Sequence, residues 1–155
     1  MSNFMNAMNK YRRARWCYTH GLKPMAKAYE MHIYLVRNSF IPASCELGGG
    51  TIFGYKGIGR VIHKRVKVGR NCIIGQQATI GGRSGHYGVP VIGDNREKCT
   101  GAKVLGPIKS GNNVTIGAYA VMITDAPDNT VWAGVPARCI KTIDTGQVSP
   151  LKGDM

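Results

Sequence analysis

Acidic residues are scarce in this 155-residue chain, which holds 8 Asp and Glu against 21 Lys and Arg. The formal net charge is +13, and no acid lies between Glu46 and Asp94. A charge of this sign attracts nucleic acid, anionic lipid or a multiply phosphorylated cofactor. No helix-turn-helix, RNA-recognition or zinc-finger pattern accompanies it, so nucleic acid is the least favoured of these partners.

Long apolar runs and paired cysteines are also missing. No stretch approaches the roughly 18 apolar residues of a transmembrane helix, and residues 1–30 are too basic and too interrupted for a signal peptide. The five cysteines are odd in number, scattered and without a CxxC pair, which favours reduced thiols over disulfides or zinc ligands. These absences predict a soluble, cytoplasmic protein.

A six-residue repeat fills the chain from Ile62 to Pro127. Its first slot is aliphatic, its second is mostly Gly, and its fifth is small or branched. The first-slot residues are Ile62, Val68, Ile74, Ile80, Ile92, Val104 and Ile116. Strands repeat every two residues and helices every 3.6 or so, so neither produces a fixed period of six. A coil with three flat sides does, because each side takes one hexad and turns one aliphatic side chain inward.

The pattern divides the chain into three parts. Residues 1–39 are expected to form a helical segment, broken into two helices at Gly21 and Pro24. Residues 40–142 form the coil and residues 143–155 a flexible polar tail. The first helix interleaves arginines with aromatic residues. This fits either peripheral contact of the basic N-terminal segment with the anionic inner face of the membrane or packing of the aromatics on the coil. A single thin prism leaves large flat faces exposed, which predicts an oligomer.

Five stretches carry a family resemblance. They are Ile58-Gly-Arg-Val-Ile-His, Ile80-Gly-Gly-Arg-Ser-Gly-His, Val91-Ile-Gly-Asp-Asn, Gly101-Ala-Lys-Val-Leu-Gly-Pro-Ile and Ala133-Gly-Val-Pro-Ala-Arg. With the hexads, they resemble the bacterial hexapeptide-repeat acyltransferases, and most of all the serine-acetyltransferase-like O-acetyltransferases of surface-polysaccharide pathways. The resemblance implies an all-β fold: a single-stranded left-handed parallel β-helix preceded by a short helical segment.

The chemistry implied is transfer of acetyl from acetyl-CoA to a hydroxyl of a surface-polysaccharide sugar or its precursor. A hydroxyl is a weak nucleophile, so a general base with a pKa near 7 must take its proton, and His suits this task. His86 is the first candidate, because it fills an aliphatic slot in a Gly/Pro-rich stretch that should leave the coil. His63 is the second, because it follows Ile62 and should point outward. His20 and His32 are taken as structural.

The resemblance also implies a CoA site along the later coils. Backbone groups and small residues at Thr100, Gly101 and Ala118 would contact the cofactor. Arg138 and Lys141 would meet its phosphates, with Arg suited to fork-like contacts.

Two departures separate the chain from serine acetyltransferases. Their catalytic Asp–His pair falls on Ser39 and Lys56, and their second active-site His falls on Val89. We therefore expect a sugar hydroxyl rather than L-serine as acceptor. No acid is close to His86 in sequence, which leaves Glu46 and Asp94 as the nearest candidates to orient its ring.

Three positions break the hexad rule, since Arg96, Lys98 and Ser110 occupy slots where the repeat calls for aliphatic residues. A buried, unpaired Lys costs several kcal/mol. Residues 95–99 therefore bulge outward, or face a solvent channel or bound anion, or the chain is a degraded copy.

Other readings compete with the acetyltransferase, which we expect to be a homotrimer with sites between neighbouring prisms. A γ-type carbonic anhydrase needs three zinc histidines, whereas the coil offers only His63 and His86, so no metal is expected. A catalytically silent scaffold or basic membrane-surface adaptor is favoured by the missing Asp–His pair. It is opposed by the intact sequence stretches of the family.

Overall fold

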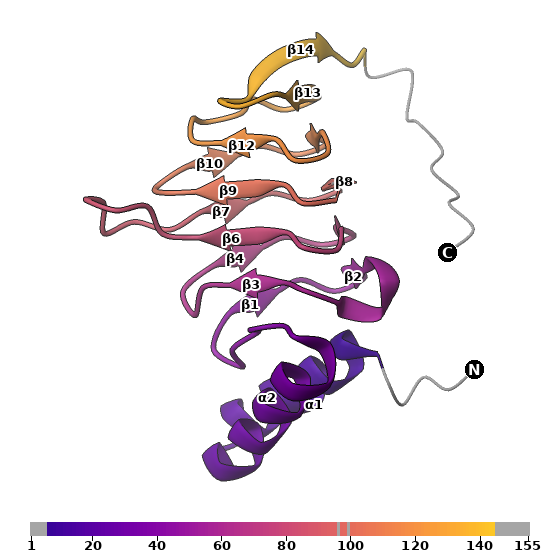
Figure 1. Ribbon diagram of the computed structural model, residues 1–155, viewed down its shortest axis with the longest axis vertical. Coiled ribbons are helices and arrows are strands. Elements are labelled where there is room, and N and C mark those ends of the chain that lie inside the picture. The colour runs from indigo at the N-terminus through magenta and orange to yellow at the C-terminus, as the bar shows by residue number, and fades with distance from the viewer. Residues whose placement is uncertain (1–5, 96, 99, 145–155) are drawn as a thin grey trace.

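Two helices precede the β-structure in the computed structural model, which describes residues 6–95, 97–98 and 100–144 (Figure 1). α1 spans Ala7–Thr19 and α2 spans Lys23–Arg37, so the predicted break between them is confirmed. The Asn6 side chain caps α1 by accepting a hydrogen bond from the Met8 backbone N–H. Pro24 lies in the first turn of α2, where its missing N–H leaves no helical bond unmade.

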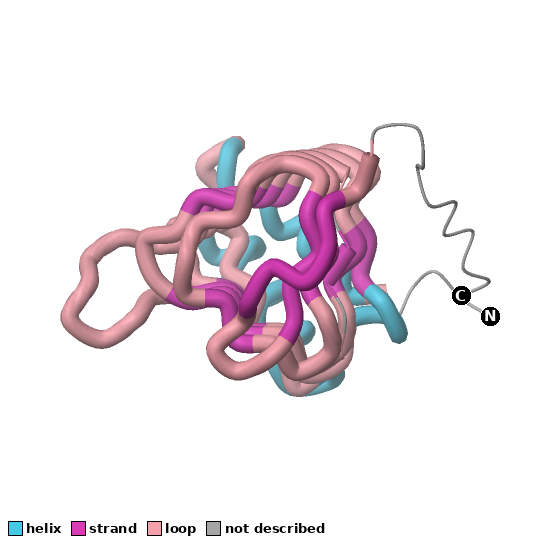
Figure 2. The backbone as a smooth tube through the Cα atoms, turned by 90° about the horizontal axis from the view of Figure 1, so that it is seen from above, coloured by secondary structure: helices cyan, strands magenta, loops and turns pink. Residues whose placement is uncertain are grey.

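Three sheets, named A, B and C here, form the sides of a prism (Figures 1 and 2). Sheet A contains β3 (Val61–Ile62), β6 (Thr79–Gly81), β9 (Lys103–Leu105) and β12 (Val121–Met122). Sheet B contains β1 (Glu46–Leu47), β4 (Lys67–Val68), β7 (Val91–Ile92) and β10 (Lys109–Ser110). Sheet C contains β2 (Ile52–Phe53), β5 (Ile73–Ile74), β8 (Glu97–Lys98), β11 (Thr115–Ile116), β13 (Thr130–Ala133) and β14 (Arg138–Thr142). A short 3₁₀ segment, Gly54–Gly57, follows β2.

Each turn of the coil visits sheets A, B and C in that order, and neighbouring strands in each sheet pair in parallel up to β13. Among the described strands, only β14 reverses, pairing antiparallel with β13 at the end of the prism. The predicted left-handed parallel β-helix is therefore confirmed.

The aliphatic first-slot residues form the interior. In sheet A the column Ile62, Ile80, Val104 and Met122 is in register from one rung to the next, and all four are fully buried. Most β-helix strands are only two residues long, with the second residue inward, so burial of one aliphatic per hexad supplies the core.

The glycine slot has a steric reason at Gly69. A Cβ at this position would lie 2.6 Å from the carbonyl oxygen of Gly93 on the next rung. Stacked rungs lie about 4.8 Å apart. A side chain at Gly69 would therefore collide with the backbone above it.

The helices pack at one end of the prism, with β14 at the other (Figure 1). Met8 and Tyr11 of α1 join the main core, and the Tyr11 hydroxyl donates to the Cys45 carbonyl at 2.6 Å. Of the two alternatives for the first helix, inward packing of Tyr11 is the one observed. Trp16 and Tyr18, however, are largely exposed. Within the described residues, no helix has the length and apolarity needed to cross a membrane.

The irregular hexads keep the register of the coil where they are described. Lys98 pairs at the backbone with Ile74 below and Ile116 above, so the strand does not bulge at residues 97–98. Arg96 and the side chain of Lys98 lie outside the described residues. Ser110 is buried in β10, in the inward slot that the repeat assigns to it.

Candidate functional site

The two candidate histidines of the coil lie at one corner of the prism, where sheet A turns into sheet B. We call it the histidine corner; it consists of the turn at residues 63–66, the loop at residues 82–90 and the turn at residues 106–108. His63 directly follows β3, and the loop carrying His86 joins β6 to β7. The His63 backbone N–H donates to Ile80 at 2.9 Å, which places the turn directly below the start of the loop.

His63 has a defined ring orientation. Its Nδ1 accepts a hydrogen bond from the Arg65 backbone N–H at 3.2 Å. Because a backbone N–H can only donate, the neutral ring carries its proton on Nε2. The pKa of His63 is lowered from its ordinary value by partial burial and then by the positive charges of Arg65 and Lys64. His63 therefore presents a neutral N–H donor at pH 7.

His86 lies on the loop that projects from the prism (Figures 1 and 2). Its backbone N–H donates to Arg83 at 3.0 Å, and Gly85 between them takes a φ of 80°. The side chain is exposed. The prediction that this segment leaves the coil is confirmed. Neither expected acid orients the ring: Glu46 pairs with Lys67 at 3.7 Å, and Asp94 accepts from the Arg70 N–H at a different corner.

Arg65 connects the two histidine-bearing segments. Its guanidinium donates to the Tyr87 carbonyl at 2.6 Å and lies 4.1 Å from the centroid of the Tyr87 ring. The same residue supplies the N–H that orients His63. No local sequence signal singles out Arg65, because this contact joins residues 22 positions apart.

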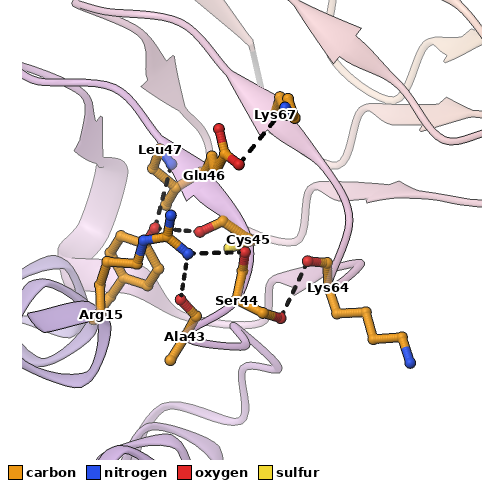
Figure 3. A network of polar contacts seen from close by, with 9 residues as sticks. Arg15, Ala43, Ser44, Cys45, Glu46, Leu47, Lys64 and Lys67 are labelled. Atoms are coloured by element: carbon orange, nitrogen blue, oxygen red, sulfur yellow. Dashed lines mark hydrogen bonds and ion pairs between the residues drawn. The ribbon is translucent and has the colours of Figure 1, made fainter. Parts of the chain in front are cut away.

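A polar network ties the base of the histidine corner to α1 (Figure 3). Arg15 donates to the carbonyl groups of Ala43 and Ser44 at 3.1 and 3.0 Å. The Ser44 hydroxyl in turn donates to the Lys64 carbonyl at 3.1 Å, one residue after His63. The helical segment thus supports the turn that holds His63.

The predicted CoA contacts Thr100, Gly101 and Ala118 lie at another corner, where sheet C turns into sheet A. We call it the Gly101 corner; it consists of residues 54–60, 75–78, 100–102, 117–120 and 134–137. The Gly101 N–H already donates to Gln76 at 2.9 Å, and the Thr100 carbonyl accepts from Tyr119 at 2.8 Å. Ala118 is exposed, whereas Gly101 is buried.

The Tyr119 ring covers Gly101. A Cβ at Gly101 would lie 2.6 Å from two ring carbons, and Gly101 has a φ of 70°. The Tyr119 hydroxyl donates to the Gln77 side chain at 3.3 Å. A ligand using the backbone of Gly101 must therefore displace this exposed ring.

Arg138 and Lys141 are exposed on β14, at opposite ends of its pairing with β13. Arg138 pairs with Ala133, beside the turn that tops the Gly101 corner, whereas Lys141 pairs with Val131 toward the far end of the strand. Arg138 is therefore aligned with the predicted CoA contacts, and Lys141 is displaced from them.

Sheet A separates the two corners within one chain. From Ala102 to Gly106 the backbone advances four residues, or about 13 Å in an extended strand. One chain thus places the histidines and the predicted CoA contacts at opposite edges of one face.

The positions aligned with the catalytic Asp–His pair of serine acetyltransferases are occupied by Ser39 and Lys56 in this chain. Ser39 is buried, donates to Gly57 at 2.7 Å and accepts from the Arg60 N–H at 2.9 Å. Lys56 is exposed, with a φ of 56°. Ser39 therefore holds the backbone of the loop.

Arg60 is a buried residue that the sequence analysis missed. Its Nη2 donates to the carbonyls of Gly54 and Ile74, both at 2.6 Å, and its guanidinium lies 4.8 Å from the Phe53 ring centroid. Among the residues that the structure describes, its Nε and Nη1 have no hydrogen-bond partner. Burial lowers the pKa of Arg60 to about 10.

A groove of about 570 Å³ lies between α1 and sheet B. Its lining residues are Tyr11, Arg12, Arg15, Trp16, Thr19, Glu46, Leu47, Gly48 and Val68. It contains neither candidate histidine. In the part of the chain that the structure describes, no group of three His, Cys, Asp or Glu residues is arranged to hold a metal ion.

The chain is similar in sequence to two bacterial proteins that are both named serine acetyltransferases. A serine acetyltransferase from Synechococcus elongatus is 36% identical over 132 residues, covering 84% of this chain and 54% of that protein. One from Mycobacterium tuberculosis is 33% identical over 152 residues, covering 96% of this chain and 63% of that protein. No family model matches the chain.

The fold of the chain is also similar to that of a solved serine acetyltransferase. The crystal structure of a serine acetyltransferase from Brucella abortus in complex with coenzyme A superposes with a TM-score of 0.83 at 30% identity. The match covers 89% of this chain and 56% of that one. The chain therefore spans between about half and two thirds of the length of these proteins.

Proposed function

We propose that this chain, a serine-acetyltransferase-like hexapeptide-repeat β-helix protein, transfers an acetyl group from acetyl-CoA to the hydroxyl of an acceptor. The observation that carries the proposal is the histidine corner on this fold: His63 with a fixed N–H donor and His86 on a projecting loop, joined by Arg65. The relatives and the CoA-bound Brucella structure support the choice of donor.

L-serine is the better supported acceptor. The relatives are named serine acetyltransferases, which corrects the ranking in the sequence analysis, where a saccharide was favoured. A sugar hydroxyl remains the second candidate for one reason. Ser39 and Lys56 occupy the positions expected for the Asp–His pair, and Ser39 is occupied in backbone hydrogen bonds.

In the proposed reaction His86 acts as general base. Its neutral imidazole removes the proton of the acceptor hydroxyl as the oxygen attacks the thioester carbon of acetyl-CoA. The tetrahedral intermediate then expels the CoA thiolate, which takes the proton from His86, and the acetyl ester is released. The exposed ring on a projecting loop allows an acceptor to approach it.

His63 serves as a hydrogen-bond donor in this mechanism. Its Nδ1 is occupied by the Arg65 N–H, so Nε2 carries the proton and cannot accept one. A neutral N–H donor can stabilise the oxyanion that develops in the transition state, and donors that are already oriented stabilise it most. We therefore assign the base to His86 and oxyanion stabilisation to His63.

Acetyl-CoA is proposed to place its phosphates at Arg138, near the top of the Gly101 corner, with Thr100 and Ala118 along its arm. Gly101 joins only if Tyr119 moves, and Lys141 contributes long-range charge. The homotrimer and the cytoplasmic location expected from the sequence belong to the same proposal.

Two measurements test it. Thermal shift with CoA should raise the midpoint, because a ligand at about 100 times its Kd adds about 2.7 kcal/mol of stability. No shift with CoA in the millimolar range would exclude the donor. In a thiol-release assay, His86→Ala should lower kcat by roughly 10² to 10⁴-fold, and the exposed-residue control His32→Ala should not. Full activity of His86→Ala would refute its role.

The acceptor is tested in the same assay. L-serine should support CoA release above the rate of hydrolysis, with a panel of monosaccharides and D-serine as comparison. Turnover with sugars alone would move the acceptor to the second candidate.

A further inference from the structure

α2 carries two apolar stripes on opposite sides. The inner stripe contains Ala26 and Ile33, both buried. The outer stripe contains Met25, Ala28, Met31 and Leu35, spaced three or four residues apart. Ala28 and Leu35 are each two positions beyond Ala26 and Ile33, and two residues turn a helix by about 200°. The outer stripe therefore faces away from the protein.

The outer stripe is open in this chain. Met25 and Met31 are each 51% exposed and Leu35 is 73% exposed, with Tyr34 and Val36 exposed beside them. An amphipathic helix normally turns one such stripe to the core and polar residues to water. A second apolar stripe on the water side indicates an interaction surface.

Charge identifies the partner. The two helices carry seven basic residues, namely Lys10, Arg12, Arg13, Arg15, Lys23, Lys27 and Arg37, and all except the buried Lys10 are at least partly exposed. Glu30 is their one acid, and it is engaged by the Ala43 N–H at 2.7 Å and by Lys27 at 3.1 Å. A second copy docked through this surface would bring two strongly basic ends together, whereas an anionic lipid surface attracts them.

We infer that the outer stripe of α2 docks on an anionic lipid bilayer, with α2 lying in the interface. Met25, Met31 and Leu35 enter the boundary between headgroups and acyl chains, and Lys23 and Lys27 meet the lipid phosphates. The helices occupy the end of the prism opposite β14, so docking leaves the corners along the prism sides uncovered (Figure 1). Membrane contact of the first helix was one of two alternatives from the sequence, and Tyr11 of that helix is buried.

The test is co-sedimentation of the full chain with phosphatidylcholine vesicles, with or without about 30 mol% phosphatidylglycerol. Binding is expected only to the anionic vesicles and should weaken as salt is raised. The double variant Met31→Ser/Leu35→Ser should bind at least tenfold or so more weakly, and Lys23→Gln about fivefold.

The matched control is Ile140→Ser, which removes a 64% exposed aliphatic side chain at the other end of the prism. It should bind as the wild type does. Three results with vesicles overturn the inference: no binding to anionic vesicles, wild-type binding by the double variant, or an equal loss of vesicle binding in the Ile140→Ser control. Vesicle-free dimers in sedimentation velocity that the double variant abolishes would also overturn it, because a second copy would then cover the stripe.

Discussion

Arg60 is enclosed in the prism, and two of its guanidinium nitrogens lack a hydrogen-bond partner within the described part of the chain. Burial disfavours its charged form, while two carbonyls and the Phe53 ring stabilise it. Burial has the larger effect, since it lowers the pKa of Arg60 to about 10. The residue therefore contributes shape and loop position at residues 54–60 more than net stability.

Arg60→Met should accordingly change the free energy of unfolding by less than about 2 kcal/mol, since an apolar side chain of similar length removes the buried charge. Arg60→Ala should cost roughly 3 kcal/mol or more, because it adds a cavity to the loss of the donor for the two carbonyls, which both variants share. Urea denaturation measures both. A Met variant as unstable as the Ala variant would show that the bonds to the carbonyls dominate.

His63 should titrate below the ordinary histidine pKa of about 6.5. The fold favours its neutral form, so its contribution to stability is present above that value and is lost as pH falls through the lowered pKa. Arg65→Gln removes a positive charge beside His63 and should raise the pKa of His63, whereas Arg83→Gln should leave it unchanged. NMR titration of the ring measures this. An equal effect of both variants would contradict the assigned cause.

At the scale of elements, the loop at residues 82–90 is held to the coil by Arg65. Arg65→Ala removes a hydrogen bond and a cation–π contact to Tyr87, both at an exposed site. It should cost about 1 kcal/mol or less in stability, yet lower kcat by roughly tenfold, because it frees the loop of His86 while keeping the backbone N–H that orients His63.

The control is Lys64→Ala, which removes a neighbouring positive charge without touching Tyr87. Hydrogen exchange in residues 82–90 should accelerate in the Arg65 variant alone. Equal acceleration in both variants would mean that charge, rather than the contact with Tyr87, holds the loop.

In the helical segment, local sequence pattern predicts where the helices end but not which side of α2 is buried. Gly21 and Pro24 mark the break between the two helices correctly, because backbone rules for Gly and Pro act within a few residues. Local pattern did not predict which side of α2 would be covered. Both of its stripes are apolar, and only contacts with α1 and the coil select Ala26 and Ile33.

At the scale of the whole molecule, the separation of the two corners by about 13 Å of sheet A bears on assembly. In a homotrimer, the histidine corner of one copy can face the Gly101 corner of the next. His86 and Arg138 would then act from different copies.

Mixed trimers test this arrangement. His86→Ala and Arg138→Glu should each be inactive or nearly so. Their equal mixture, unfolded and reassembled together, should regain about a quarter of the wild-type activity, since random mixing gives one site in four both intact residues. Measured CoA release that stays at the level of the single variants would place both residues in one copy. A monomer in light scattering would exclude the shared site.

The sequence alone determined the β-helix, because its rule is local: an aliphatic residue every sixth position fills the prism, and Gly69 sits where the next rung passes too close for a side chain. It also predicted that His86 would leave the coil, since an imidazole in an aliphatic slot beside glycines does not fit the interior. The tertiary structure decided the rest. The proton position on His63, the burial of Arg60 and the open stripe of α2 all depend on which distant segments pack together, and no local period records that.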